Sequence, residues 1–190
     1  MKSFLKSRKA LSTVVTTLII LVVAVMLSSV VTFYAINVTT TKTSEESLQI
    51  YKQHMWNNGT TFSESAFVII NTGGRDVVFD KITVRGQDTA ITKTYFNKTA
   101  ETISADLTYL QPNQNGTAIA NTTITVGSAN YTLTQGSTGE NLILPAGKSM
   151  IIYIVDPDHI SVSDIGVTVG FTVFTSNAQW YKECNVEAAP

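Results

Sequence analysis

Apolar residues dominate one unbroken stretch near the N-terminus of the chain. Residues 10–41 contain no charged side chain, and residues 14–36 are predominantly apolar on every face of a helix. At about 1.5 Å per residue, a helix over residues 10–41 would be roughly 50 Å long, against about 30 Å for the hydrocarbon core of a bilayer. No proline or glycine occurs before Gly59. The pattern therefore predicts a continuous helix that is long enough to cross a membrane.

Beyond residue 39 the pattern becomes amphipathic. Leu48, Tyr51 and Met55 recur at intervals of three and four residues, which is typical of one face of a helix, and the charged residues of this stretch lie before or between them (Lys42, Glu45, Glu46 and Lys52). We therefore expect the helix to continue to Trp56 and to end at the Asn-Asn-Gly stretch of residues 57–59.

The rest of the chain has the residue types and turn signals of β-strands. The expected strands are residues 66–71, 77–84, 91–96, 102–109, 117–126, 129–134, 149–155 and 167–175, with an added edge strand at 179–182. Short strands at intervals of roughly 8–12 residues indicate a β-sandwich. The expected fold class is α+β, with a short basic segment at residues 1–10, a helix over 11–56 and an all-β sandwich over 57–190.

Charge is distributed unevenly along the chain. Lys2, Lys6, Arg8 and Lys9 are four of the 13 basic residues, and without residues 1–10 nine basic side chains face 14 acidic ones, a net charge of −5. A basic N-terminus before an apolar helix places residues 1–10 in the cytoplasm and the residues after about 40 outside. The acidic outer domain argues against nucleic acid as a partner. Its high threonine content and the 14% of charged residues in the chain favour an uncharged, β-rich surface.

The junction between the basic segment and the apolar segment resembles that of type IV prepilins and archaellins. In that family a small residue follows the basic cluster, and a membrane peptidase cuts before the apolar helix. Here the stretch Arg-Lys-Ala-Leu-Ser at residues 8–12 is similar to the archaeal version, which implies cleavage between Ala10 and Leu11. The segments NTGGRDVVFDKITVRG and LPAGKSMIIYI also resemble the immunoglobulin-like outer domain of archaeal pilins and archaellins.

The chain departs from parts of the family pattern. Bacterial pilins usually carry Gly before the cut and Glu at the fifth mature position, where this chain has Ala10 and Val15. Archaellins usually carry Gly before the cut and further glycines soon after it, and this helix has none. The resemblance thus implies a subunit of an archaeal adhesive pilus that polymerises with itself, with an archaeal prepilin peptidase, a pilus assembly platform and, before assembly, the membrane as partners.

Three other functions stay open on the sequence. An archaellum subunit would share the junction and the helix. A membrane-anchored extracellular binding domain would need only the helix and a folded outer domain. An extracellular enzyme lacks support, because neither His54 nor His159 lies in a catalytic motif and no phosphate-binding glycine motif occurs. We expect no catalytic activity, no cofactor and no metal, and we interpret the acidic stretch at 156–164 as a turn.

Six Asn-x-Ser/Thr sequons are candidates for N-glycosylation, and they are Asn37, Asn58, Asn97, Asn115, Asn121 and Asn130. Three of them cluster between residues 115 and 132, which favours a glycosylated outer face. Asn37 lies within the predicted helix and is the weakest candidate. The single cysteine, Cys184, excludes an intramolecular disulfide, and we expect it to be a small buried residue near the last strand.

Overall fold

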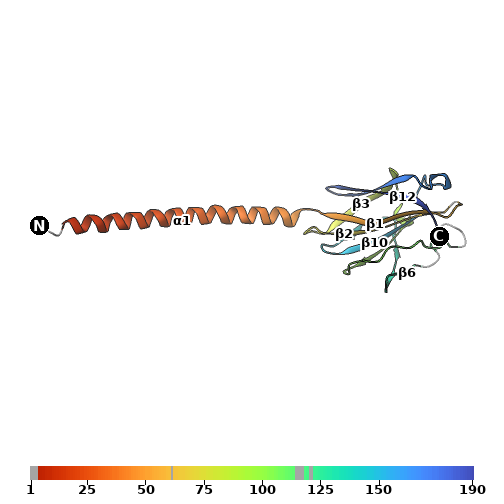
Figure 1. The fold of residues 1–190 in the computed structure, drawn as a ribbon, viewed down its shortest axis with the longest axis horizontal. Helices are drawn as coiled ribbons and strands as arrows, with labels where there is room; N and C mark the ends of the chain where they lie inside the picture. The colour runs from red at the N-terminus through yellow and green to blue at the C-terminus, as the bar shows by residue number, and fades with distance from the viewer. Residues whose placement is uncertain (1–3, 61, 114–117, 120–121) are drawn as a thin grey trace. The chain divides into compact units, whose positions relative to one another are not determined.

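A long helix and a β domain make up the chain in a computed structural model that describes residues 4–60, 62–113, 118–119 and 122–190 (Figure 1). The chain divides into two compact units, Met1–Thr43 and Ser44–Pro190. Within the helix, side chains are described from Ser12 onward. This organisation confirms the expected α+β class, a long N-terminal apolar helix followed by a β-sandwich.

Helix α1 (Phe4–Ser44) is 41 residues long. It runs without interruption because no proline removes a backbone donor and no glycine loosens the backbone. The hydroxyls of Thr16, Thr17 and Ser29 each donate to a carbonyl oxygen three or four residues earlier, at 2.9 Å. These three hydroxyls therefore find their hydrogen-bond acceptors within the helix and do not oppose an apolar surrounding.

The expected continuation of the helix to Trp56 is wrong. Residues Leu48–Asn57 form strand β1, which pairs antiparallel with β2 (Ser63–Asn71) and, at its end, parallel with β12 (Gln179–Ala188). A register shift between Tyr51 and His54 marks a β-bulge, where Lys52 has a φ of 53°.

The bulge explains why the sequence pattern misled. Leu48 and Met55 are seven residues apart, so a regular strand would place them on opposite faces. One extra residue in the bulge turns both side chains into the core, where they are 3% and 0% exposed. The helix-like spacing thus belongs to a bulged strand, and the β domain begins before the expected boundary at residue 57. The Asn-Asn-Gly stretch belongs to the connection between β1 and β2 rather than to a helix end.

In its described residues, the β domain contains one ten-stranded sheet and one separate hairpin. The strand order in the sheet is β4-β3-β11-β12-β1-β2-β10-β5-β8, and β9 pairs with β3 outside this path. Strands β6 and β7 form the hairpin. The remaining strands are β3 (Val77–Val84), β4 (Gln87–Asp88), β5 (Thr94–Thr99), β6 (Thr123–Val126), β7 (Ala129–Thr132), β8 (Thr134–Gln135), β9 (Leu142–Leu144), β10 (Ser149–Val155) and β11 (Thr168–Thr175), with short 3₁₀ turns η1 (Ile91–Lys93) and η2 (Val162–Asp164).

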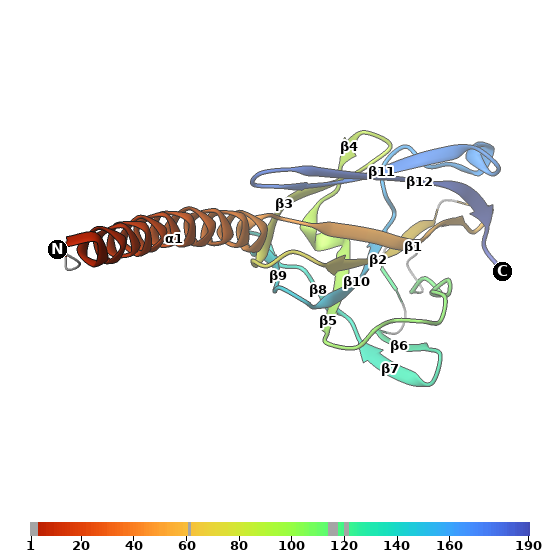
Figure 2. The ribbon, with the colours of Figure 1, turned by 60° about the vertical axis from the view of Figure 1, so that its left-hand side comes forward.

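Two apolar cores lie within the described part of the β domain. In the main core, residues of β2 and β10 pack against residues of β3 and β11, and the rings of Phe67 and Phe171 lie 5.6 Å apart. The second core lies on the opposite face of β2 and β10, where Tyr153 packs among Leu107 and Ile124. In Figure 2, β3, β11 and β12 lie on one side of β1, β2 and β10, and the β6–β7 hairpin lies on the other. Strands β2 and β10 are covered by apolar side chains on both faces, which is why their sequences contain continuous apolar runs.

Four expected strands, at 66–71, 77–84, 149–155 and 167–175, are confirmed with small changes of boundary. The expected strand at 102–109 is wrong, because these residues form no strand in the described part of the chain. The expected edge strand at 179–182 is longer, as β12, and lies between β11 and β1 in the sheet order.

The three remaining expectations are met in part. Residues 91–93 of the expected strand at 91–96 form the turn η1, and β5 begins only at Thr94. The expected strand at 129–134 is divided between β7 and β8. In the expected strand at 117–126, residues 123–126 form β6, while residues 117, 120 and 121 lie outside the described residues.

Candidate functional site

The large apolar side chains described for α1 are not packed against other residues of their own unit. Every large apolar side chain from Val14 to Val38 is exposed, from 41% for Val22 to 73% for Phe33. The segment Ser12–Ser44 has a mean hydropathy of 2.8 in its most apolar window, and none of that window is buried. Its length and composition suit a membrane span or a signal anchor. Exposed apolar surface of this extent is typical of a site that contacts a membrane or another protein.

The predicted cleavage junction, Ala10–Leu11, lies within α1. Only the helical backbone of these two residues is described, and their side chains lie outside the described part of the chain. The junction itself therefore remains a prediction from the sequence.

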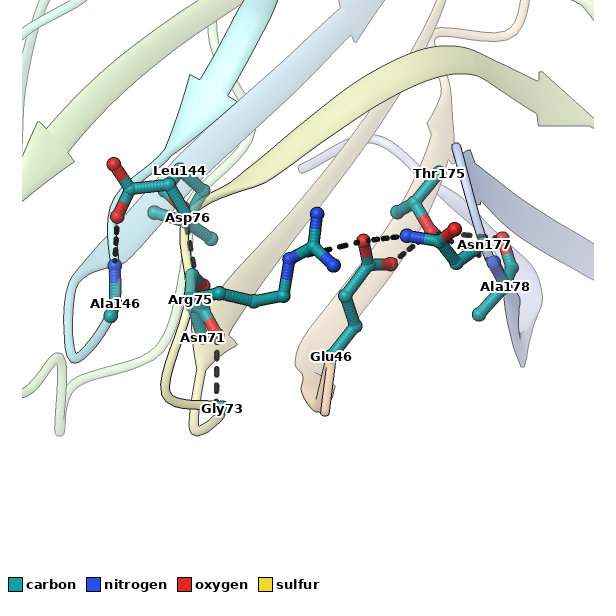
Figure 3. Close-up of polar contacts among 10 residues, drawn as sticks. All are labelled: Glu46, Asn71, Gly73, Arg75, Asp76, Leu144, Ala146, Thr175, Asn177 and Ala178. Atoms are coloured by element: carbon teal, nitrogen blue, oxygen red, sulfur yellow. Dashed lines mark hydrogen bonds and ion pairs between the residues drawn. The ribbon is translucent and has the colours of Figure 1, made fainter. Parts of the chain in front are cut away.

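A polar cluster holds the residues that follow α1 onto the β domain, and Figure 3 draws it. Its centre is the carboxylate of Glu46, whose side chain is only 6% exposed. Thr175 Oγ1 donates to Glu46 Oε2 at 2.8 Å, and Asn177 Nδ2 donates to Oε1 at 2.5 Å. Arg75 Nε lies 3.9 Å from Oε1 on the other side. We call Glu46, Asn71, Arg75, Thr175 and Asn177 the base cluster.

Asn71 completes the base cluster at the end of β2. Its Nδ2 donates to the carbonyl oxygens of Arg75 and Leu144, at 2.7 and 3.1 Å, and its Oδ1 accepts from Gly73 N at 3.0 Å. Gly73 is required here, since an added Cβ would lie 2.7 Å from the carbonyl oxygen of Glu45 and 2.8 Å from the nitrogen of Ser47. The turn after β2 and the segment that leaves α1 are thereby packed backbone against backbone.

Sequence reasoning missed the base cluster. The Gly-Gly turn at residues 73–74 was the available signal, because adjacent glycines permit close backbone approach. Nothing in the sequence paired Glu46 with Asn177, which lies 131 residues away along the chain.

The structure separates the sequons by the use of their side-chain amides. Asn130 in β7 is exposed; its Oδ1 accepts from Thr125 Oγ1 at 2.7 Å, and no described residue accepts from its Nδ2, the atom that carries a glycan. Asn97 in β5 is half-buried and uses its Nδ2 to donate to the Thr132 carbonyl at 2.7 Å. Asn130 is thus the better acceptor by geometry.

The other four sequons are less favourable or untested. Asn58 also has no described acceptor for its Nδ2, but unlike Asn130 it is half-buried. Its Oδ1 accepts hydrogen bonds from the Thr60 amide, the Thr60 hydroxyl and the Phe62 amide, which fix the side chain in the connection between β1 and β2. Asn37 lies on the apolar surface of α1. Asn115 and Asn121 lie outside the described residues.

The two histidines make separate contacts within the β domain. His54 Nε2 lies 2.9 Å from Asp106 Oδ1, and its ring stacks on Trp56 at 4.9 Å. His159 contributes its backbone, because its carbonyl oxygen accepts from Arg85 Nη1 at 2.8 Å. Each histidine thus connects elements that are far apart along the chain.

Three aspartates of the acidic stretch at 156–164 form ion pairs with two cations from other elements. Lys93 Nζ lies 3.6 Å from Asp156 Oδ2 and 3.3 Å from Asp158 Oδ1, and Arg85 Nη1 lies 2.8 Å from Asp164 Oδ1. Within the described residues, no group of three or more His, Cys, Asp or Glu side chains is disposed to hold a metal ion.

Cys184 lies in β12 and packs against the main core. Burial raises the pKa of its thiol to about 12, so the reactive thiolate is scarce at neutral pH. The expected position near the last strand and beside apolar residues is confirmed, although the residue is half-buried rather than buried.

In comparisons with known proteins, no family model matches the chain and no curated protein matches it. The inference of function therefore rests on the residues of the chain and on their geometry.

Proposed function

We propose that the chain is a structural subunit of an archaeal type IV adhesive pilus. The subunit is made as a membrane-inserted precursor and is cut by an archaeal prepilin peptidase between Ala10 and Leu11. A pilus assembly platform then transfers it into an extracellular filament, in which the α1 helices of many copies pack together. The observation that carries the proposal is the surface of α1, which is uncharged from residue 10 to residue 41 and apolar all round in its central part.

Transfer energetics support polymerisation. Each apolar side chain of α1 is stable in lipid, and it can leave lipid only where another apolar surface covers it again. A bundle of identical helices provides that cover. Ala24, Ser28 and Ser29 are small, and they allow neighbouring helices to approach closely. Repetition of one such contact gives an open helical polymer when the rotation does not close a ring.

The base cluster supports a role in which the subunit bears tension. Glu46 binds the segment after α1 to two separate parts of the β domain, the turn containing Arg75 and the end of β11 at Thr175. A pull on this segment is therefore resisted by several side-chain contacts and not by the peptide chain alone.

Peptide mass spectrometry of material sheared from whole cells tests the proposal. We expect the protein to be abundant there and to begin at Leu11. Ala10→Phe should block cleavage and remove the filaments, whereas the matched variant Ala10→Gly should mature normally. Filaments of normal length from Ala10→Phe would contradict the proposal.

The fraction in which the protein is found separates the membrane-anchored alternative, and a deletion strain separates the archaellum alternative. A membrane-anchored binding domain would stay in the membrane fraction and keep Met1 and Lys2. An archaellum subunit would appear in the sheared fraction, but its deletion would abolish swimming and leave surface attachment intact.

A further inference from the structure

Residues 103–111 cross the outer face of β2 and β10 without joining the sheet, and we call them the strap. Their burial alternates as in a strand, with Ile103 and Leu107 only 3% and 4% exposed while residues 104, 106 and 108 are exposed. Among the described residues, however, the strap forms no strand and enters no ladder. What holds it in place must therefore come from side chains.

Side chains of β1 hold the first half of the strap. Lys52 Nζ donates to the Ser104 carbonyl at 2.6 Å. His54 Nε2 lies 2.9 Å from Asp106 Oδ1. These two contacts fall on alternate residues of the strap, as ladder hydrogen bonds would.

Side chains of β10 and β2 hold the second half at the same spacing. Tyr153 Oη donates to the Thr108 carbonyl at 2.9 Å, and Glu64 Oε1 accepts from Leu110 N at 2.9 Å. Contacts from side chains thus take the place of ladder hydrogen bonds between backbones along the strap. Several of these side chains are ionisable.

Glu64 is the most constrained of these groups. It lies in β2 opposite Trp56 of β1, and the residue is 0% exposed. Its second oxygen, Oε2, has no hydrogen-bond partner among the described residues. A carboxylate in this position would be a buried charge with one amide hydrogen bond, whereas a neutral carboxylic acid is tolerated.

We propose that the strap is a proton-operated latch, closed over the second core while Glu64 is a neutral acid and released when Glu64 loses its proton to solvent. Opening lets water reach the carboxylate and uncovers the apolar face around Tyr95 and Tyr153. The latch does not depend on polymerisation, so the test of the latch is independent of the test of the pilus proposal.

The direction of the pH effect follows from the surroundings of Glu64. Burial raises the pKa of Glu64 from 4.5 to about 8, and the Leu110 amide lowers it only in part. The closed form thus binds the proton more tightly than an open form in water. The closing equilibrium should fall by up to about tenfold per pH unit as pH rises from about 4.5 to about 8, and it should level off above that.

The phenols near Glu64 do not titrate in this window. Burial raises the pKa of Tyr109 and of Tyr153, and the neighbouring Glu64 charge raises both further. Both phenols therefore stay neutral throughout, and Glu64 is the group of the second core whose charge changes between about pH 4.5 and pH 8.

Other charged groups lie at the first half of the strap, away from Glu64. Hydrogen bonding to His54 lowers the pKa of Asp106, which stays ionised. Lys52 carries a positive charge beside it, and Glu187 lies 3.8 Å from His54 Nδ1.

Hydrogen–deuterium exchange of the full chain in detergent tests the latch. After correction for intrinsic exchange rates, protection of peptides within 103–111 should fall between about pH 5 and pH 8, while protection of β10 should not. Glu64→Gln keeps a neutral, isosteric side chain and should remove most of this fall. The matched exposed variant Glu183→Gln and the variant His54→Gln should both retain it. Protection that does not change with pH, or a fall that Glu64→Gln retains or that His54→Gln removes, would overturn the proposal.

Infrared spectroscopy provides a second measurement if Glu64→Gln folds poorly. The wild-type chain at about pH 6 should show the carbonyl stretch of a protonated, buried carboxyl, and this band should disappear in step with the loss of strap protection. A band that is missing at pH 6, or one that disappears while the strap stays protected, would also overturn the latch.

Discussion

Helix α1 and the paired strands β2 and β10 are built from similar residues but use them in opposite ways. Ile19 and Leu21 of α1 are 56% and 63% exposed, whereas Ile69 of β2 and Ile152 of β10 are 0% exposed. A helix pairs its backbone groups internally and can leave its side chains uncovered, whereas a strand must find neighbours to pair its backbone. Apolar side chains therefore stabilise the β domain in β2 and β10, and remain uncovered in α1.

A charged residue should give the largest separation between the two regions. Ile152→Asp buries an unpaired charge and should unfold the β domain, as seen by loss of tryptophan fluorescence and β-sheet circular dichroism. If α1 spans a membrane and assembles into a filament, as proposed, Ile20→Asp costs about 2.5–3.5 kcal/mol in the membrane, which the rest of α1 outweighs, so the chain should stay inserted and folded but filament yield should fall. Ile152→Val and Ile20→Leu are the matched controls. A folded β domain in Ile152→Asp would contradict the comparison.

Truncation should give the next largest difference. Ile154→Ala in β10 leaves a cavity and should lower the free energy of unfolding of the β domain by about 2–5 kcal/mol. Ile20→Ala in α1 should change it by less than about 0.5 kcal/mol, as for other substitutions outside a packed core. Urea titration followed by tryptophan fluorescence compares the two, and equal losses would mean that the two regions do not differ in this way.

Glu46 lies just after α1 in the chain, and its removal should have a moderate effect. Glu46→Ala leaves the Thr175 hydroxyl and the Asn177 amide without their acceptor and should cost about 1–3 kcal/mol. Asp88→Ala removes only an exposed ion pair with Lys81 and should cost less than about 1 kcal/mol. The same titration measures both variants, and a Glu46→Ala loss no larger than that of Asp88→Ala would remove the base cluster from the account.

The smallest effect is expected at the candidate glycosylation sites. If Asn130 carries a glycan, Asn130→Gln should remove the extra mass from the peptide that contains it, and it should change stability by no more than about 0.5 kcal/mol. Asn97→Gln should instead cost about 0.5–1.5 kcal/mol, because Asn97 donates to the Thr132 carbonyl. Glycopeptide mass spectrometry and urea titration separate the two sites. Extra mass on Asn97 and none on Asn130 would reverse their order.

Local signals in the sequence did not predict the end of α1 at Ser44, but they were enough to predict its apolar stretch, because an uncharged apolar stretch without proline or glycine needs only hydrogen bonds within itself to form a helix. The same holds for β3, β10 and β11, whose residue types and flanking turns mark them as strands. These features suffice for the fold class.

Contacts between distant residues, in contrast, became visible only in the folded chain. Leu48 and Met55 have the spacing of a helix, but the ladders of β1 with β2 and β12 make them part of a bulged strand. The burial of residues along the strap alternates as in a strand. The strap, however, contacts side chains of β1, β2 and β10 and not a free strand edge with which its backbone could pair. Glu46 and Glu64 look like ordinary surface acids in the sequence, and both are buried by partners far along the chain. Such contacts depend on strand order and register, which residue periodicity does not encode.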